Sequence, residues 1–168
     1  MSEKVLAAVT PSPARRWLAI GMMVVLGGLL VYIALAAPPQ GLFFRVFMLA
    51  VGVGALLLAE RLRRSTMVSI ELTEAGLRDT DGRELCRFDN IAAVERGAFA
   101  FKPSNGFLVR LKSPMGRVWQ PGLWWRYGRR IGVGGVTPAS QAKFMADLIA
   151  MKLKGVDSIL NELQDGRD

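Results

Sequence analysis

Two long apolar segments near the N-terminus restrict the folds open to this chain more than any other feature. Residues 17–37 contain no charged side chain, and residues 42–59 contain only one, Arg45. At about 1.5 Å of rise per residue, a helix over either segment is about as long as the roughly 30 Å hydrocarbon layer of a bilayer. The sequence Pro-Pro-Gln-Gly at 38–41 separates the two segments. We therefore expect a hairpin of two antiparallel transmembrane helices.

Basic residues flank this hairpin on both sides and predict its orientation. They are Arg15 and Arg16 before the first segment and Arg61, Arg63 and Arg64 after the second. Residues 38–41 carry no charge. Because Lys and Arg are concentrated in cytoplasmic loops, we expect both termini in the cytoplasm and the Pro-Pro turn outside. In this interpretation residues 1–16 are a cytoplasmic leader and residues 17–64 are the membrane anchor.

Several features of the anchor allow a second interpretation. Arg45 lies close to the outer turn, so its guanidinium either reaches the lipid headgroups or pairs with another subunit. The sequence Ala-Leu-Ala at 34–36 resembles a signal-peptide cleavage site, although the apolar segment is long and a second one follows at once. Small residues with the spacing for close helix contact, within the hairpin or between copies, are Ala50 with Gly54 and Ala55 with Ala59.

From residue 67 onward the apolar pattern changes to a period of two, which is typical of half-buried β-strands. Asp81-Gly82 and Asn105-Gly106 are hairpin signals between such strands. We expect six to seven short antiparallel strands, with a turn at Pro114-Met115-Gly116. The expected strands lie at 68–73, 77–80, 83–88, 91–96, 107–112, 117–120 and 129–133.

An amphipathic helix is predicted after the strands. Thr137 is a suitable N-cap, Pro138 a suitable first helical residue, and Gly155 ends the predicted helix. The apolar face expected to cover the core consists of Phe144, Met145, Leu148, Ile149 and Met151. The domain is thus predicted at 67–155, followed by a short amphipathic tail at 156–168.

The residues at 67–151 resemble the bacterial pleckstrin-homology-like (PH-like) domains that often adjoin transmembrane helices. The resemblance rests on 70–77 (Ile-Glu-Leu-Thr-Glu-Ala-Gly-Leu), 88–94 (Phe-Asp-Asn-Ile-Ala-Ala-Val), the Asn105-Gly106 turn and 131–133 (Ile-Gly-Val) before the helix. It implies a mostly β, α+β domain capped by a C-terminal helix, which serves as a scaffold for lipid or protein binding without catalytic activity. Phosphoinositide-binding members carry basic residues around the first loop, whereas here this loop is Glu74-Ala75-Gly76.

A basic and aromatic segment is the strongest candidate for an interaction site. Residues 96–146 contain no acidic side chain, and within them tryptophans alternate with arginines. Such a mixture suits the membrane interface, where aromatic rings lie at headgroup level and cations meet anionic lipid. The alternative is that Trp119 and Trp124 fill the core while the arginines are merely solvated. The candidate residues are Arg110, Lys112, Arg117, Trp119, Trp124, Trp125, Arg126, Arg129 and Arg130.

The composition argues against catalysis. The chain has no histidine, which removes the commonest general base and metal ligand. Its one cysteine, Cys86, lies in a strand pattern and is expected to be a buried thiol. We therefore predict no catalytic residue, cofactor, metal, small-molecule substrate or nucleic-acid partner.

The sequence thus predicts a non-enzymatic protein of the bacterial inner membrane. We expect its cytoplasmic domain to dock on, or organise, a membrane protein complex or a homo-oligomer through the basic and aromatic segment. A module that binds anionic lipid at the membrane surface is the first alternative. An accessory subunit of an enzyme or transporter is the second.

Overall fold

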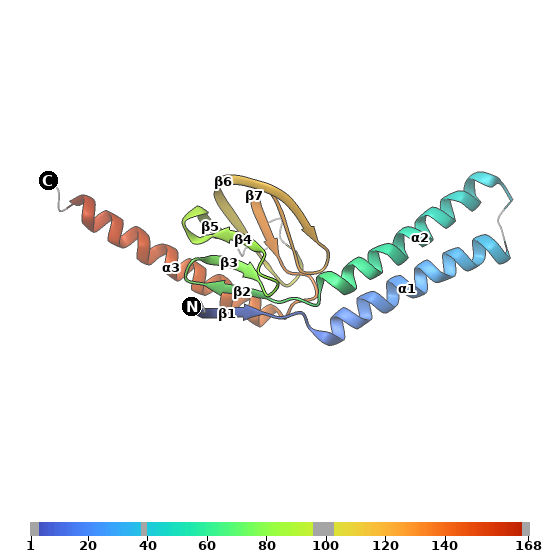
Figure 1. Ribbon diagram of the computed structural model, residues 1–168, viewed down its shortest axis with the longest axis horizontal. Helices are drawn as coiled ribbons and strands as arrows, with labels where there is room; N and C mark the ends of the chain where they lie inside the picture. The colour runs from blue at the N-terminus through green and yellow to red at the C-terminus, as the bar shows by residue number, and fades with distance from the viewer. Residues whose placement is uncertain (1–3, 38–39, 96–102, 166–168) are drawn as a thin grey trace.

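The computed structural model describes residues 4–37, 40–95 and 103–165, with residues 156–165 described as backbone only. A helical hairpin projects from one end of a domain that contains two antiparallel sheets and a C-terminal helix (Figure 1). The predicted combination of two apolar helices, six to seven antiparallel strands and a final helix is confirmed, although one of the seven strands precedes the hairpin.

The hairpin consists of α1 (Pro13–Ala36) and α2 (Leu42–Ser65). Both helices are long and apolar enough to cross a membrane, and 24 residues each give about 36 Å of helix. The helix α1 begins before the apolar segment because Pro13 suits a first helical turn. The helix α2 continues past Ala59 to Ser65, so the basic residues that follow the apolar segment are helical.

Glycines on facing sides let the two helices pack closely. A Cβ atom at Gly27 would lie 2.8 Å from the carbonyl oxygen of Gly52, and Gly52 is confined in the same way by Val31 and Gly27. By contrast, Ala50 and Gly54 are exposed. The helix contact in the hairpin therefore uses Gly27 and Gly52 rather than the Ala50/Gly54 spacing.

The first sheet contains a strand from the predicted leader. Its order is β1 (Val5–Val9), β2 (Ile70–Thr73), β3 (Gly76–Asp79) and β4 (Glu84–Arg87). In the antiparallel register of β1 with β2, Val9 lies opposite Ile70, and both side chains are buried. The prediction that residues 1–16 are only a leader is therefore wrong. The hairpin is inserted between two neighbouring strands, so both of its domain-side ends lie on one side of any membrane it crosses.

The second sheet is formed by β5 (Ile91–Glu95), β6 (Phe107–Gln120) and β7 (Trp124–Val133). The predicted turn at Pro114-Met115-Gly116 is wrong, because these residues lie inside β6, where the register with β7 shifts on both sides of Met115. Such irregularities bend a strand, and Figure 1 shows β6 arching over the domain. The curl of the β6–β7 hairpin brings its tip back to its base, where Gly134 N–H donates to the carbonyl oxygen of Leu123.

The helix α3 (Ala139–Asp165) packs one side onto the core. Ala142, Met145 and Ile149 are buried against the sheets. The helix continues through Gly155, so the predicted C-terminal end of the helix is wrong. At the other end, the hydroxyl of Thr137, the predicted N-cap, donates to the carbonyl oxygen of Asn105. The predicted apolar face is also too wide, since Phe144 and Met151 are exposed.

Candidate functional site

The outer surface of the β6–β7 hairpin near its tip carries alternating aromatic and basic residues. Trp119 lies opposite Trp125 in the register, and the Arg117 guanidinium lies 5.7 Å from the centre of the Tyr127 ring. Residues two apart on a strand share a face, which explains why these four side chains lie together. They line a shallow hollow of about 550 Å³. We call Arg117, Trp119, Trp125 and Tyr127 the aromatic face.

Two tryptophans of this segment have different environments. Trp119 is 48% exposed, whereas Trp124 is 1% exposed and belongs to the core. The site prediction for Trp124 is therefore wrong, because the side chain of this residue points to the opposite side of β7 from that of Trp125. Trp125 is half-buried, and its ring lies against Gly132, where a Cβ atom would come within 2.4 Å of it. A glycine at this position keeps the Trp125 ring flat on the strand.

The tip of the β6–β7 hairpin is attached to the end of α2. The Arg61 guanidinium lies 5.4 Å from the centre of the Trp119 ring. One turn along, the Ser65 hydroxyl donates to the carbonyl oxygen of Pro121, and Gly122 packs against Leu62. The aromatic face is thus continuous with the helix end at which the apolar segment stops.

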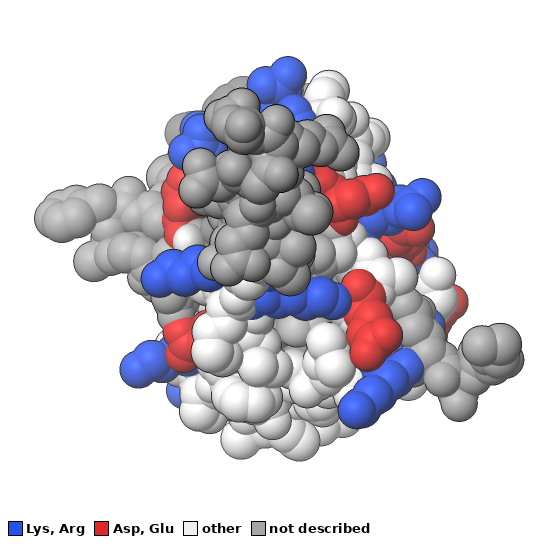
Figure 2. All heavy atoms as spheres, turned by 90° about the vertical axis from the view of Figure 1, so that its left-hand side faces the viewer, with Lys and Arg blue, Asp and Glu red and all other residues white. Residues whose placement is uncertain are grey.

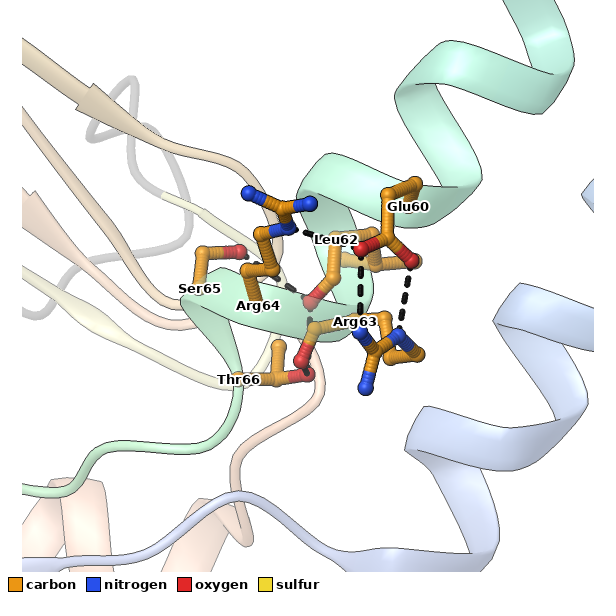
Figure 3. Close-up of polar contacts among 6 residues, drawn as sticks. All are labelled: Glu60, Leu62, Arg63, Arg64, Ser65 and Thr66. Carbon is orange, nitrogen blue, oxygen red and sulfur yellow. Dashed lines mark hydrogen bonds and ion pairs between the residues drawn. The ribbon is translucent and has the colours of Figure 1, made fainter.

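The last turn of α2 is itself held rigidly, as Figure 3 shows. Both Arg63 and Arg64 bond to the Glu60 carboxylate, with the shortest N–O distances at 2.7 Å. The Thr66 hydroxyl donates to the carbonyl oxygen of Leu62, and the Ser65 hydroxyl oxygen lies 3.1 Å from the same carbonyl oxygen. These contacts are local to the last turn of α2, whereas the bond from Ser65 to Pro121 and the contact of Leu62 with Gly122 join this turn to the domain.

The other arginines that predicted the topology lie at both ends of the hairpin. At the domain end, Arg15 donates to the carbonyl oxygen of Thr137, and the Arg16 guanidinium lies over the Trp17 ring at 5.4 Å. Arg45 is exposed in the first turn of α2, at the end away from the domain. Within the described ranges no ion pair involves Arg45.

Arg126, one of the predicted interaction residues, has a structural role. Its Nη1 donates to the carbonyl oxygen of Leu85 at 2.6 Å, and its Nε donates to that of Gly116 at 2.8 Å. The side chain therefore joins β7 to the edge of β4 and connects the two sheets. Arg126 is thus held by the fold, and it also lines the hollow of the aromatic face.

We call the curved β6–β7 hairpin the arch. The remaining candidate cations lie on it. Arg110 is paired with Glu95 at 3.3 Å and lies opposite Arg130 in the register. Lys112, Arg129 and Arg130 are exposed. The end of the domain away from the hairpin is different, since Figure 2 shows acidic and basic side chains interspersed there. The structure thus brings Arg117, Trp119 and Trp125 together with Tyr127 of the same segment and with Arg61, which the sequence indicated only as a topology residue.

Two other features of the described chain bear on its chemistry. Cys86 is buried, and this burial raises the pKa of its thiol to about 12, so the residue is a poor nucleophile. Among residues 4–37, 40–95 and 103–165 no group of three His, Cys, Asp or Glu side chains could hold a metal ion.

Comparisons with protein-family models, with curated proteins and with solved structures find no match to this chain.

Proposed function

We propose that this protein is a non-enzymatic membrane-surface module. In this proposal α1 and α2 cross the bacterial inner membrane, and a PH-like domain lies against the cytoplasmic leaflet with its aromatic face on anionic lipid. The arrangement of a four-stranded and a three-stranded sheet with a C-terminal helix supports the PH-like assignment. Arginines at the domain end of both helices support the cytoplasmic orientation.

The contact between Arg61 and Trp119 is the observation on which this proposal depends. Arg61 is the second residue after the apolar segment of α2, so its side chain lies where the hydrocarbon layer ends and the headgroups begin. Because Trp119 packs on this guanidinium at 5.4 Å, the aromatic face is at headgroup level. Tryptophan and tyrosine prefer that depth, since their rings combine an apolar body with a polar group.

Charge on the arch adds to this attraction. A basic side chain near an anionic leaflet contributes about 1 kcal/mol, and the contribution falls off within a Debye length of about 10 Å at 0.1 M salt. Lipid-facing arginines should therefore be shielded from solvent reagents only when the membrane is anionic and the salt concentration is low. The exposed cations of the arch are Lys112, Arg117, Arg129 and Arg130.

Arginine labelling of the full-length protein in nanodiscs tests the proposal. We would compare phenylglyoxal labelling of Arg117 in phosphatidylcholine nanodiscs and in nanodiscs that also contain phosphatidylglycerol, with mass spectrometry as the readout. We expect anionic lipid to slow Arg117 labelling by about fivefold, which corresponds to ~1 kcal/mol, and about 1 M salt to remove the difference. Arg87 on β4 is an exposed control outside the arch, and its labelling should not change. Equal labelling of Arg117 in both membranes would refute the proposal.

Docking on a membrane protein is a second candidate function, and a feature of α3 favours it. Phe144 and Met151 are about two helical turns apart, and both are exposed on a helix that covers the core with its other side. Exposed apolar side chains at this spacing can bind the surface of a partner protein or a second copy. Gentle detergent extraction followed by native separation tests it. We expect a species larger than the monomer that Phe144→Ser with Met151→Ser disrupts, and migration of the unmodified protein as a monomer would contradict docking.

A further inference from the structure

A second hollow lies beside the end of α2, between this helix and the first sheet. Its volume is about 470 Å³, which is within the range of small-ligand sites. One wall is a single face of α2, formed by Leu57, Glu60, Arg61 and Arg64, whose spacing of three and four residues places them in a row. The opposite wall comes from the β3–β4 turn and the end of β6, and it includes Asp79, Asp81, Arg83 and Gln120.

The groove is lined by as many acidic as basic side chains, and their partners differ from one wall to the other. The Asp79 carboxylate is buried and accepts a hydrogen bond from Arg83 N–H at 2.8 Å, which fixes the β3–β4 turn. Asp81 and the Arg83 guanidinium are exposed at this turn, and neither is in an ion pair with any part of the chain that the structure describes. On the helix wall, Arg64 is bonded to Glu60 and retains free N–H groups.

The order of side chains along α2 matches the order of chemical groups in a phospholipid. Leu57 is 68% exposed and belongs to the apolar segment, so it lies beside acyl chains. Arg61 and Arg64 follow at about 6 Å and about 10 Å further along the helix axis, at the depth of lipid phosphates. Asp81 lines the same groove from the β3–β4 turn.

We propose that this groove binds the headgroup of an aminophospholipid from the adjoining leaflet, that is, a phosphoethanolamine group. Arg61 and Arg64 donate to the phosphate, and Asp81 accepts hydrogen bonds from the primary ammonium group. This site shares Arg61 with the contact to Trp119, and it rests on the proposed function in one respect, that α1 and α2 cross the membrane.

The groove favours this headgroup over the two common alternatives. A headgroup with a net negative charge would place its phosphate near three arginines but would gain nothing from Asp79 and Asp81, whose carboxylates repel anions. A choline headgroup has no N–H donor, so Asp81 could attract it only by charge. Charge-assisted hydrogen bonds are roughly twice as strong as neutral ones, which gives the primary ammonium the advantage.

Native mass spectrometry of the full-length protein in detergent tests the inference. The probes are phosphatidylethanolamine, phosphatidylcholine and phosphatidylglycerol with identical acyl chains, supplied in equal amounts. We expect phosphatidylethanolamine to be retained about tenfold more than either competitor, the factor given by one charge-assisted hydrogen bond. Asp81→Asn should reduce its retention to the level of phosphatidylcholine. Asp89→Asn, which removes an exposed carboxylate after β4, is the matched control and should change nothing.

Two further measurements distinguish this groove from the aromatic face and from a site for soluble ligands. Arg117 lies on the aromatic face and not in the groove. Arg117→Gln should therefore leave phosphatidylethanolamine retention unchanged, although it weakens contact with anionic lipid. Soluble glycerophosphoethanolamine should not displace the lipid, because it lacks the acyl chains that would pack against Leu57. Equal retention of phosphatidylglycerol, or the same preference in Asp81→Asn as in the unmodified protein, would overturn the proposal.

Discussion

The packing of the two hairpin helices gives the sharpest prediction about stability, which is that Gly27→Ala destabilises the protein whereas Gly28→Ala does not. At Gly27 the new Cβ atom would lie 2.8 Å from the carbonyl oxygen of Gly52 and 2.9 Å from Cγ of Leu56. Ordinary contacts of a Cβ atom need at least about half an ångström more. Because the oxygen belongs to the backbone, α1 and α2 must separate, and overpacking of this kind costs about 1–3 kcal/mol.

The neighbouring glycine is a matched control. A Cβ atom at Gly28 meets nothing within 4 Å, so Gly28→Ala changes the chemistry of α1 equally without touching α2. The assay is thermal unfolding of the full-length protein in mild detergent, followed by the helical circular-dichroism signal. For a chain of this size each kcal/mol lowers Tm by about 2–4 °C, so we expect a drop of about 2–12 °C for Gly27→Ala only. Equal melting temperatures for the two variants would refute the helix contact described here.

Three further predictions concern the domain. Val9→Asp should unfold it, because Val9 is fully buried in β1 and an isolated buried carboxylate is strongly unfavourable; Val5→Asp, at an exposed position of the same strand, should melt like the unmodified protein. Trp124→Ala should lower the free energy of unfolding in a denaturant titration by about 3–5 kcal/mol, whereas Trp119→Ala should lower it by about 1 kcal/mol or less. Because burial raises the pKa of the Cys86 thiol to about 12, this thiol stays protonated at about pH 9, where an ordinary cysteine is mostly thiolate. Maleimide should therefore label Cys86 in denaturant but not in the native protein, and rapid labelling of the native protein would contradict its burial.

The sequence predicted the elements that depend on local pattern. Length and hydropathy located α1 and α2, and alternation located the strands from Ile70 to Glu95. Gly82, with a φ angle of +81°, and Asn105, with a φ angle of +56°, adopt the left-handed backbone that the Asp-Gly and Asn-Gly signals indicate. Each of these features is determined by a few neighbouring residues, so one sequence contains enough information to find it.

Contacts between distant residues could not be predicted in this way. The strand β1 is stable because it pairs with β2 across the whole hairpin, and a five-residue apolar stretch gives no sign of such a partner. The bend in β6 is also a property of the sheet, since the sequence Pro-Met-Gly at 114–116 is equally suitable for a turn. Continuous pairing of β6 with β7 sends Trp124 inward and leaves Trp119 exposed. The interaction of Arg61 with Trp119 joins two elements with no shared sequence pattern.

The depth of Trp119 in the bilayer tests the central claim most directly. In a variant with Trp17→Phe and Trp125→Phe, the remaining tryptophans are Trp119 and Trp124, and Trp124 is shielded by the core. Lipids brominated near the top of their acyl chains quench tryptophans only on contact. If the aromatic face lies at headgroup level, these lipids should quench this variant clearly more than one in which Trp119 is also replaced by phenylalanine. Equal quenching of the two variants would contradict the account.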